Sequence, residues 1–383
     1  MSEWIDARTA LTRLGVRPQT LYAYVSRGRL TAQSDPDDPR RSLYRAAEVE
    51  ALTERKGRSR KPADVAARAI AWGEPVLTSA ITTVAGGRLF YRGRDAETLA
   101  ETETLEAVAR LLRGGDGASL KRAERSHPPP GPTFRARAFA ALAARAGSEP
   151  PTSGRNPLHL AMQAGAVLDV MADAAAGRAG EGPIHARLAA AWGLDPVGQG
   201  ADLIRRALVL LADHELNAST FAARVAASTG ASIAASALAG LAALTGPRHG
   251  GASAAVRTLL HDAAARGAGP AVEAWLGEER ALPGFGHPLY PEGDPRACLI
   301  ARIDMPPDLE AIRRAAADIA GKIPNIDFAL VALAESLGLP EESPFALFAV
   351  ARCAGWTAHA IEQGQSPGII RPRARYVGPE PQA

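Results

Sequence analysis

GPRHGG (246–251), PGFGHPLYPEGDPRA (283–297) and PNIDF (324–328) are three short segments that set two histidines and one aspartate among glycines and prolines. Glycine and proline force turns, and each segment interrupts sequence that is otherwise rich in alanine and leucine and helical in pattern. We therefore expect the two histidines and the aspartate to lie at helix ends or on loops that face a cleft.

The composition favours an all-α fold. Of the 383 residues, 46% are hydrophobic but only 5% are aromatic, which is typical of helices packed through small side chains. Alternation of valine, isoleucine and aromatic residues with period two is scarce, which argues against a β-rich fold. The uncharged run 225–247 predicts a close-packed Ala-rich helix from Val225 to Leu244 and not a membrane span.

Cysteine usage indicates a cytoplasmic protein. Cys298 and Cys353 both lie in apolar helical sequence and are expected to be reduced core residues. The N-terminus MSEWIDARTA has no signal pattern, and no Cys/His spacing predicts a metal site.

The first 62 residues carry a basic excess, with 13 lysines and arginines against 8 aspartates and glutamates. From residue 4 the pattern is helix, turn, helix and hairpin: Leu11 and Leu14 share one helix face, Gly15 ends that helix, and Pro18 opens the next. The pattern resembles the winged helix-turn-helix of MerR-type and excisionase-type DNA-binding domains. A helical extension with merely solvated arginines is the alternative.

In the DNA-binding interpretation, residues of the second helix read bases and residues of the wing contact phosphates. The expected residues are Arg17, Gln19 and Tyr22 for the helix and Arg40, Arg41 and Arg45 for the wing. A single copy could recognise DNA usefully only if the rest of the protein dimerises.

The segment LLADHELNASTFAARVAAST (210–229) leads from His214 into a helix that begins near Asn217, and ITTVAGGRLFYRGRDAETLA (81–100) has the character of a hairpin followed by a helix. Together with the three opening segments and their order, these segments resemble citrate synthase and 2-methylcitrate synthase from about Val76 to Gly378. The resemblance implies a helical homodimer that condenses acetyl-CoA or propionyl-CoA with oxaloacetate, an acyltransferase without a bound cofactor or metal.

This reaction needs a carboxylate base for the methyl proton, a donor for the enolate oxygen and a donor for the ketone. The resemblance assigns these roles to Asp327, His249 and His287, respectively. His249 precedes Gly250 and Gly251, where the backbone could approach a ligand closely.

The two carboxylates of oxaloacetate call for arginines. The resemblance implies Arg296 and Arg371 as carboxylate ligands, and His214 as a further substrate contact. Lys322 is a candidate for the CoA phosphates, and a solvated helix end is the equal alternative.

Three departures from the family pattern weaken this expectation. Pro288 stands where many members have a basic residue, and Ser253 stands where Asn is common. The chain also ends at Ala383 without the extended tail that in the family carries an arginine across the dimer interface. Arg373 and Arg375 are candidates to replace that arginine.

The predicted organisation is a winged helix-turn-helix domain, a linker, and a large and a small helical domain. Their residues are 1–57, 58–75, 76–250 with 338–383, and 251–337, respectively. The functional alternative is a DNA-binding regulator that uses the synthase fold as a metabolite sensor. Both alternatives share oxaloacetate and acyl-CoA as ligands and DNA as a possible partner.

Overall fold

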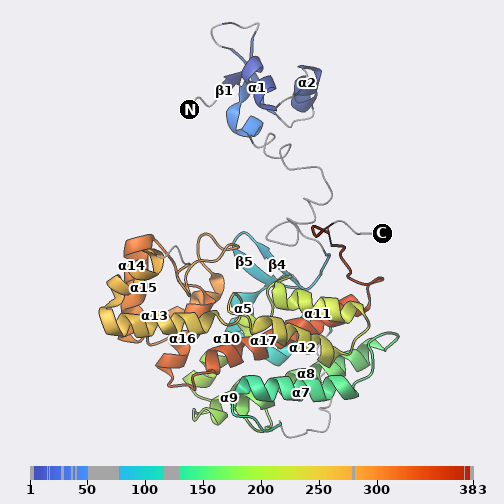
Figure 1. Ribbon diagram of the computed structural model, residues 1–383, viewed down its shortest axis with the longest axis vertical. Coiled ribbons are helices and arrows are strands. Elements are labelled where there is room, and N and C mark those ends of the chain that lie inside the picture. Colours follow the sequence, from blue (N-terminus) through green and yellow to red (C-terminus); the bar gives the residue numbers. More distant parts are fainter. Residues whose placement is uncertain are drawn as a thin grey trace. The chain divides into compact units, whose positions relative to one another are not determined.

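The computed structural model divides the chain into two compact units, Met1–Thr78 and Ser79–Ala383 (Figure 1). It describes residues 4–379 except 15, 17, 27–29, 36–37, 39–40, 51–76, 116–128, 278–280 and 375. The expected linker, 58–75, lies outside the described residues. Each unit has a hydrophobic core of its own.

The described part of the first unit combines helices with a three-stranded antiparallel sheet of order β1-β3-β2. Its elements are β1 (Trp4–Asp6), α1 (Ala7–Leu14), α2 (Pro18–Ser26), β2 (Ala32–Ser34) and β3 (Ser42–Arg45). α2 begins at the proline that the sequence predicts as a helix start, because proline is well suited to the first turn. Buried Ala10, Leu14, Leu21 and Tyr44 join these elements in one core.

The second unit opens with a small antiparallel sheet, β4 (Thr82–Ala85), β5 (Arg88–Tyr91) and β6 (Arg94–Asp95). α5 (Ala96–Thr102) follows directly, capped by the Asp95 side chain. The prediction of a hairpin followed by a helix in 81–100 is therefore confirmed.

The rest of the second unit is helical, as the composition predicts. Its helices are α6 (Leu105–Leu112), α7 (Phe134–Ser148), α8 (Pro157–Ala176), α9 (Ile184–Ala191), α10 (Gln199–Leu211), α11 (Ala218–Ser228), α12 (Ile233–Leu244), α13 (Ala252–Arg266), α14 (Ala268–Gly277), the 3-10 helix η1 (Pro295–Arg302), α15 (Pro307–Ala320), α16 (Ile326–Ser336) and α17 (Ser343–Gly364).

α17 is the central helix of this unit, and Figure 1 shows it among α10, α11 and α12. Nearly all of its residues are buried, and it packs against α6, α8, α10, α11 and α12. Small residues permit this close packing: a Cβ atom on Gly240 of α12 would lie 2.7 Å from Cδ2 of Trp356 on α17. The site described below is built largely from α17 and its neighbours.

The prediction of one helix from Val225 to Leu244 is wrong. The chain instead ends α11 at Ser228 and begins α12 at Ile233. Gly230 between them has φ +82°, a left-handed conformation that ends a helix, and Ser232 caps the N-terminus of α12. The break lets the two helices pack against each other.

The helices α13 to α16 form a group with η1, since α13 contacts α14, α15 and α16, and α16 contacts η1. They fall within the predicted small domain, 251–337, whose separate status stays a prediction.

The expectation for one cysteine needs correction. Cys353 is buried, but Cys298 is exposed. A 3-10 helix has three residues per turn, so η1 can bury Arg296 and Leu299 while residue 298 faces outward. None of the helices in the described ranges has the length and hydropathy that crossing a membrane demands.

Candidate active site

Main-chain contacts tie the segment of His287 to the segment of Asp327. Phe285 and Pro324 form an isolated antiparallel bridge, and the Asn325 N–H donates to the carbonyl oxygen of Gly284 at 2.8 Å. Gly284 has φ +82°, and a Cβ atom there would lie 2.8 Å from Val256. The glycine is therefore needed where this loop passes close to α13 and α16.

Asn325 also fixes the start of α16. Its Oδ1 accepts from the main-chain N–H groups of Asp327 (3.0 Å) and Phe328 (3.4 Å), and its Nδ2 donates to the carbonyl oxygen of Gly286 at 2.9 Å. An N-cap of this kind orients the first helical turn. Asp327 thereby lies in that turn, next to the loop of His287.

Arg296 is held by a buried ion pair with Asp294. Its Nε donates to Oδ1 at 2.8 Å and its Nη2 donates to Oδ2 at 2.7 Å. Burial alone would raise the pKa of Asp294, but the Arg296 guanidinium outweighs it, so the pKa of Asp294 lies below its usual 3.8. Asp294 also accepts from the Ile326 N–H at 3.1 Å, which connects Arg296 to the start of α16.

His214, His287 and Tyr290 form one aromatic cluster. The ring centroids of the two histidines lie 5.1 Å apart, and His214 Nε2 lies 2.8 Å from Tyr290 Oη. Burial, with the charges of Arg296 and Arg352, lowers the pKa of His214 well below 6.5, and burial lowers that of His287 to about 4. Both rings are therefore neutral at pH 7.

The hydrogen bonds of His287 define its tautomer. Its Nδ1 accepts from the main-chain N–H of Leu289 at 3.2 Å. A neutral imidazole has one N–H, so the proton is on Nε2. His287 can therefore act as a hydrogen-bond donor through that nitrogen.

His249 lies on the loop between α12 and α13. Its Nε2 lies 2.9 Å from Ser219 Oγ, which also accepts from Trp356 Nε1 at 3.1 Å. Burial, followed by the charge of Arg352, lowers the pKa of His249 to about 4. This ring is neutral as well, and its Nδ1 is the nitrogen that Ser219 does not occupy.

The glycines after His249 pack closely against the preceding turn. A Cβ atom on Gly250 would lie 2.7 Å from Leu244, and one on Gly251 would lie 2.9 Å from Pro247. They permit close packing of the loop against the end of α12, and their expected role beside a ligand stays a prediction.

Arg352 on α17 is the residue that the sequence reasoning missed. Its side chain is 1% exposed, its Nε donates to the carbonyl oxygen of Leu211 at 3.0 Å, and its Nη2 has no hydrogen-bond partner among the described residues. Burial lowers its pKa to about 10, so it stays charged at pH 7. An arginine inside the apolar run 344–361 is a sequence signal for such a site, since a buried charge needs a partner.

Asp327 faces this positive environment with one carboxylate oxygen unpaired among the described residues. Its Oδ1 is buried and unpaired within the described part of the chain. Burial raises the pKa of Asp327 to about 6, although Arg296 opposes the shift. A carboxylate with such a pKa is suited to accept a proton near neutral pH.

The other candidates of the second unit lie outside this cluster. Lys322 is exposed after the end of α15, and Arg371 and Arg373 are exposed on the segment after α17, while Arg375 falls outside the described residues. Ser253 is buried in α13 and Pro288 is exposed. Among the described residues there is no group of three or more His, Cys, Asp or Glu side chains that could hold a metal ion.

Replacing Asp327 by Asn should stabilise the fold at pH 8. The folded-state pKa of about 6 exceeds the usual 3.8, so the wild type loses stability as pH rises from about 4 through 6. Asn does not titrate there, so the advantage should vanish near pH 4 and reach at most about 3 kcal/mol at pH 8.

Denaturant unfolding at both pH values measures this difference. Asp294→Asn is the contrasting variant, because the pKa of Asp294 is lowered and its replacement should destabilise the protein at pH 8. A destabilised Asp327→Asn protein at pH 8 would contradict the raised pKa.

Comparison with known proteins finds sequences similar to most of the second unit. Residues 136–373 match the model of the citrate synthase C-terminal domain family. Citrate synthase 2 of Bacillus subtilis is 36% identical over 205 residues, which cover 50% of this chain and 54% of that protein. 2-Methylcitrate synthase 2 of Corynebacterium glutamicum is 36% identical over 202 residues, covering 48% and 52%. The chain thus spans about half the length of the curated relatives that it matches.

Solved structures extend the similarity. Citrate synthase of Thermotoga maritima superposes with a TM-score of 0.68 at 28% identity, covering 81% of this chain and 96% of that one. Citrate synthase of Thermoplasma acidophilum, solved as a ternary complex with carboxymethyl coenzyme A and oxaloacetate, superposes with a TM-score of 0.66 at 25% identity, covering 80% of this chain and 95% of that one. The family model spans well over half of the chain, and this chain therefore belongs to the citrate synthase family.

Proposed function

We propose that this protein condenses acetyl-CoA or propionyl-CoA with oxaloacetate and hydrolyses the product to citrate or 2-methylcitrate and free CoA. One observation carries the proposal: two buried guanidinium groups, three neutral histidines and an unpaired carboxylate of raised pKa gather around the same helix ends. The relatives named citrate synthase and 2-methylcitrate synthase support it.

Oxaloacetate would be held by charge. Arg352 is buried without a carboxylate partner within ion-pair distance in the described residues, and Arg296 keeps N–H groups beyond the two given to Asp294. Two guanidinium groups in a buried site offer the bidentate hydrogen bonds that carboxylates prefer. His214 would contact the substrate between them, and the Nε2 proton of His287 would polarise the ketone.

The acyl-CoA would lose a methyl proton to Asp327, while neutral His249 donates a hydrogen bond to the thioester oxygen as it gains charge. Donation from Nδ1 requires the Ser219 hydroxyl, which donates to Asn217 Oδ1 at 2.7 Å in the structure, to turn its proton to His249 Nε2. The resulting carbon attacks the polarised ketone and forms the new C–C bond. Water then cleaves the thioester, which gives the carboxylic acid and CoA thiol. Burial of the reacting groups strengthens each of these interactions.

Release of CoA thiol from acetyl-CoA or propionyl-CoA in the presence of oxaloacetate tests the proposal. Because Asp327 must be ionised to accept a proton, kcat/KM should fall about tenfold per pH unit below about pH 6. Asp327→Asn should lose turnover and keep oxaloacetate binding. A folded wild type that binds oxaloacetate but releases no thiol would refute the proposed catalysis.

The metabolite-sensor alternative has no support among the relatives, which are named as synthases. Two further parts of the proposal rest on the sequence analysis, namely the contact with CoA phosphates and the cellular location. We retain Lys322 as a contact for the CoA phosphates, since it is exposed five residues before Asp327. We also retain the cytoplasm as the site of action.

A homodimer is the proposed assembly. Leu158 and Met162 lie one turn apart on α8 and are 55% and 41% exposed, an apolar stripe that a second copy would cover. Arg371 is exposed in this chain, so it would be free to fill its proposed role as carboxylate ligand in the site of the partner subunit.

Sedimentation velocity tests the assembly. Met162→Glu would bury a charge in the interface and should yield monomers. Ile319→Glu is the control, because Ile319 on α15 is similarly exposed, at 42%, and it should leave the mass unchanged. A wild type that sediments as a monomer would refute the dimer.

The first unit is proposed to bind DNA. Gln19 and Tyr22 are exposed on α2, Tyr22 to 65%, and Arg41 and Arg45 are exposed beside and on β3. Arg45 also lies over the Trp4 ring at 5.9 Å, which restrains its direction. Arg17 and Arg40 lie outside the described residues, so their part in this proposal comes from the sequence.

Replacing both Arg41 and Arg45 by Ala should weaken binding to duplex DNA of arbitrary sequence. Each lost phosphate contact should flatten the slope of log affinity against log salt by about one. Fluorescence anisotropy with a labelled duplex measures both the affinity and the salt slope. Arg8→Ala is the control, since Arg8 is an exposed arginine on α1. An unchanged salt slope in the double variant would show that Arg41 and Arg45 do not contact DNA phosphates.

A further inference from the structure

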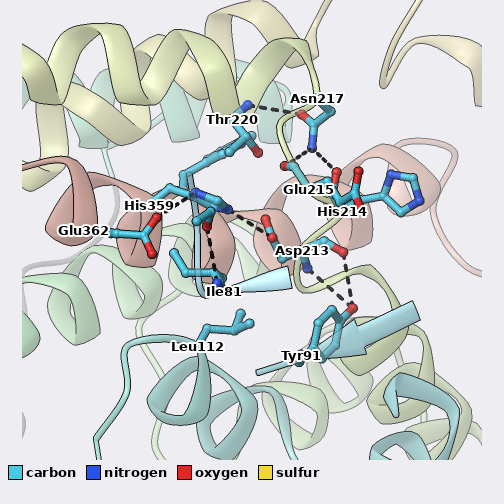
Figure 2. A network of polar contacts seen from close by, with 12 residues as sticks. Ile81, Tyr91, Leu112, Asp213, His214, Glu215, Asn217, Thr220, His359 and Glu362 are labelled. Carbon is cyan, nitrogen blue, oxygen red and sulfur yellow. Dashed lines mark hydrogen bonds and ion pairs between the residues drawn. The ribbon is translucent and has the colours of Figure 1, made fainter. Parts of the chain in front are cut away.

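A second polar network lies next to His214, and Figure 2 shows His359 on one side of Asp213 and His214 on the other. Asp213 is completely buried, and its Oδ2 lies 3.1 Å from Nε2 of His359. The other ring nitrogen of His359, Nδ1, lies 3.2 Å from Nη1 of Arg224. All three side chains are at most 2% exposed, and the proposed chemistry uses none of them.

The partners of His359 fix the direction of its hydrogen bonds. An arginine can only donate, so Nδ1 of His359 must accept from Arg224. The neutral ring then carries its proton on Nε2 and donates it to the carboxylate of Asp213. Arg224 itself is anchored, since it donates to Glu362 at 2.8 Å and to Gln363 at 2.9 Å.

This network holds the main chain immediately before His214. The Gly355 N–H of α17 donates to the carbonyl oxygen of Ala212 at 3.0 Å. Tyr91 Oη lies 3.3 Å from the carbonyl oxygen of Asp213 and 3.0 Å from that of Leu210, so it contacts the chain on the same side. Asp213 therefore turns toward His359 and α17, while the next residue, His214, turns toward Tyr290.

The residue directly after His214 has a strained backbone conformation. Glu215 has φ +50°, an uncommon conformation for a residue other than glycine, and its Oε1 accepts from the Val84 N–H at 2.8 Å. A strained residue persists only where its surroundings over-determine it. Fixed contacts on both sides of His214 supply that constraint.

We propose that His359 is a positioning residue for substrate binding: through Asp213 it fixes the main chain so that His214 faces the dicarboxylate site. This inference rests on the proposed function, because it assigns the dicarboxylate to the cluster of His214. His359 is not a catalytic residue, since Asp213 separates it from that cluster and its ring is 1% exposed.

The first experiment compares His359→Leu with His359→Gln. Leucine leaves the Asp213 carboxylate without its donor, whereas the glutamine amide can both donate to Asp213 and accept from Arg224. His359→Leu should raise the KM and the calorimetric Kd for oxaloacetate about tenfold or more, because a misplacement of about 1 Å can cost on the order of 10²-fold. His359→Gln should restore most of the affinity.

The KM for acyl-CoA should stay within about twofold in both variants, since the network lies behind the dicarboxylate site only. This separation distinguishes positioning from a general loss of structure, which would move both constants. His185→Gln, at a half-buried histidine of α9, is the matched control and should change neither constant.

A second pair of variants displaces Asp213 without removing a polar group. A Cβ atom on Gly355 would lie 2.2 Å from Asp213 Oδ1, whereas one on Gly364 of the same helix would lie 3.5 Å from Thr152, an ordinary contact. Gly355→Ala should weaken oxaloacetate binding selectively, and Gly364→Ala should not. This pair keeps the test decisive if His359→Leu fails to fold.

The outcomes separate the two claims. Unchanged oxaloacetate affinity in folded His359→Leu or Gly355→Ala protein would overturn the positioning role, even with full turnover in the wild type. Equal losses of affinity for oxaloacetate and acyl-CoA would overturn it as well. If the wild type shows no turnover but binds oxaloacetate, and the variants bind it more weakly, then the proposed catalysis fails and the positioning role stands.

Discussion

The second unit is organised around the burial of positive charge in an alanine-rich helical core. Arg296 and Arg352 are 3% and 1% exposed, and a charge removed from water is costly unless it is paired. Asp294 pairs with Arg296, whereas no carboxylate reaches ion-pair distance of Arg352 among the described residues. A folded protein that keeps such a charge is prepared for an anionic ligand.

The charges also determine the protonation of their neighbours. Burial and the two guanidinium groups keep His214 neutral, and burial raises the pKa of Asp327 although Arg296 opposes it. The site can therefore hold neutral donors and a weak acid side by side at neutral pH, which carbon–carbon bond formation from a thioester requires. Close packing makes this arrangement possible, because glycines such as Gly355 let side chains approach α17 directly.

The sequence predicted those site residues that lie beside glycine and proline breaks between helices. His249, His287 and Asp327 stand out because glycine and proline break the helices around them, and the structure places all three at loops or helix starts. Arg352 was missed because it sits in the middle of a regular helix with no local signal except its charge. The break at Gly230 was missed because the alanine-rich pattern continues on both sides of it, and this pattern was given more weight than two local signals, Gly230 and the N-cap Ser232.

The central claim is that the unpaired charge of Arg352 binds the dicarboxylate. Calorimetric titration with oxaloacetate, without acyl-CoA, tests this claim on the wild type, Arg352→Gln and Arg113→Gln. Arg113 is the control because, like Arg352, it is a largely buried arginine whose pKa is lowered by burial to about 10. The account predicts that Arg352→Gln loses about 2 to 5 kcal/mol of binding free energy and that Arg113→Gln binds like the wild type. Equal affinity in all three proteins would contradict it.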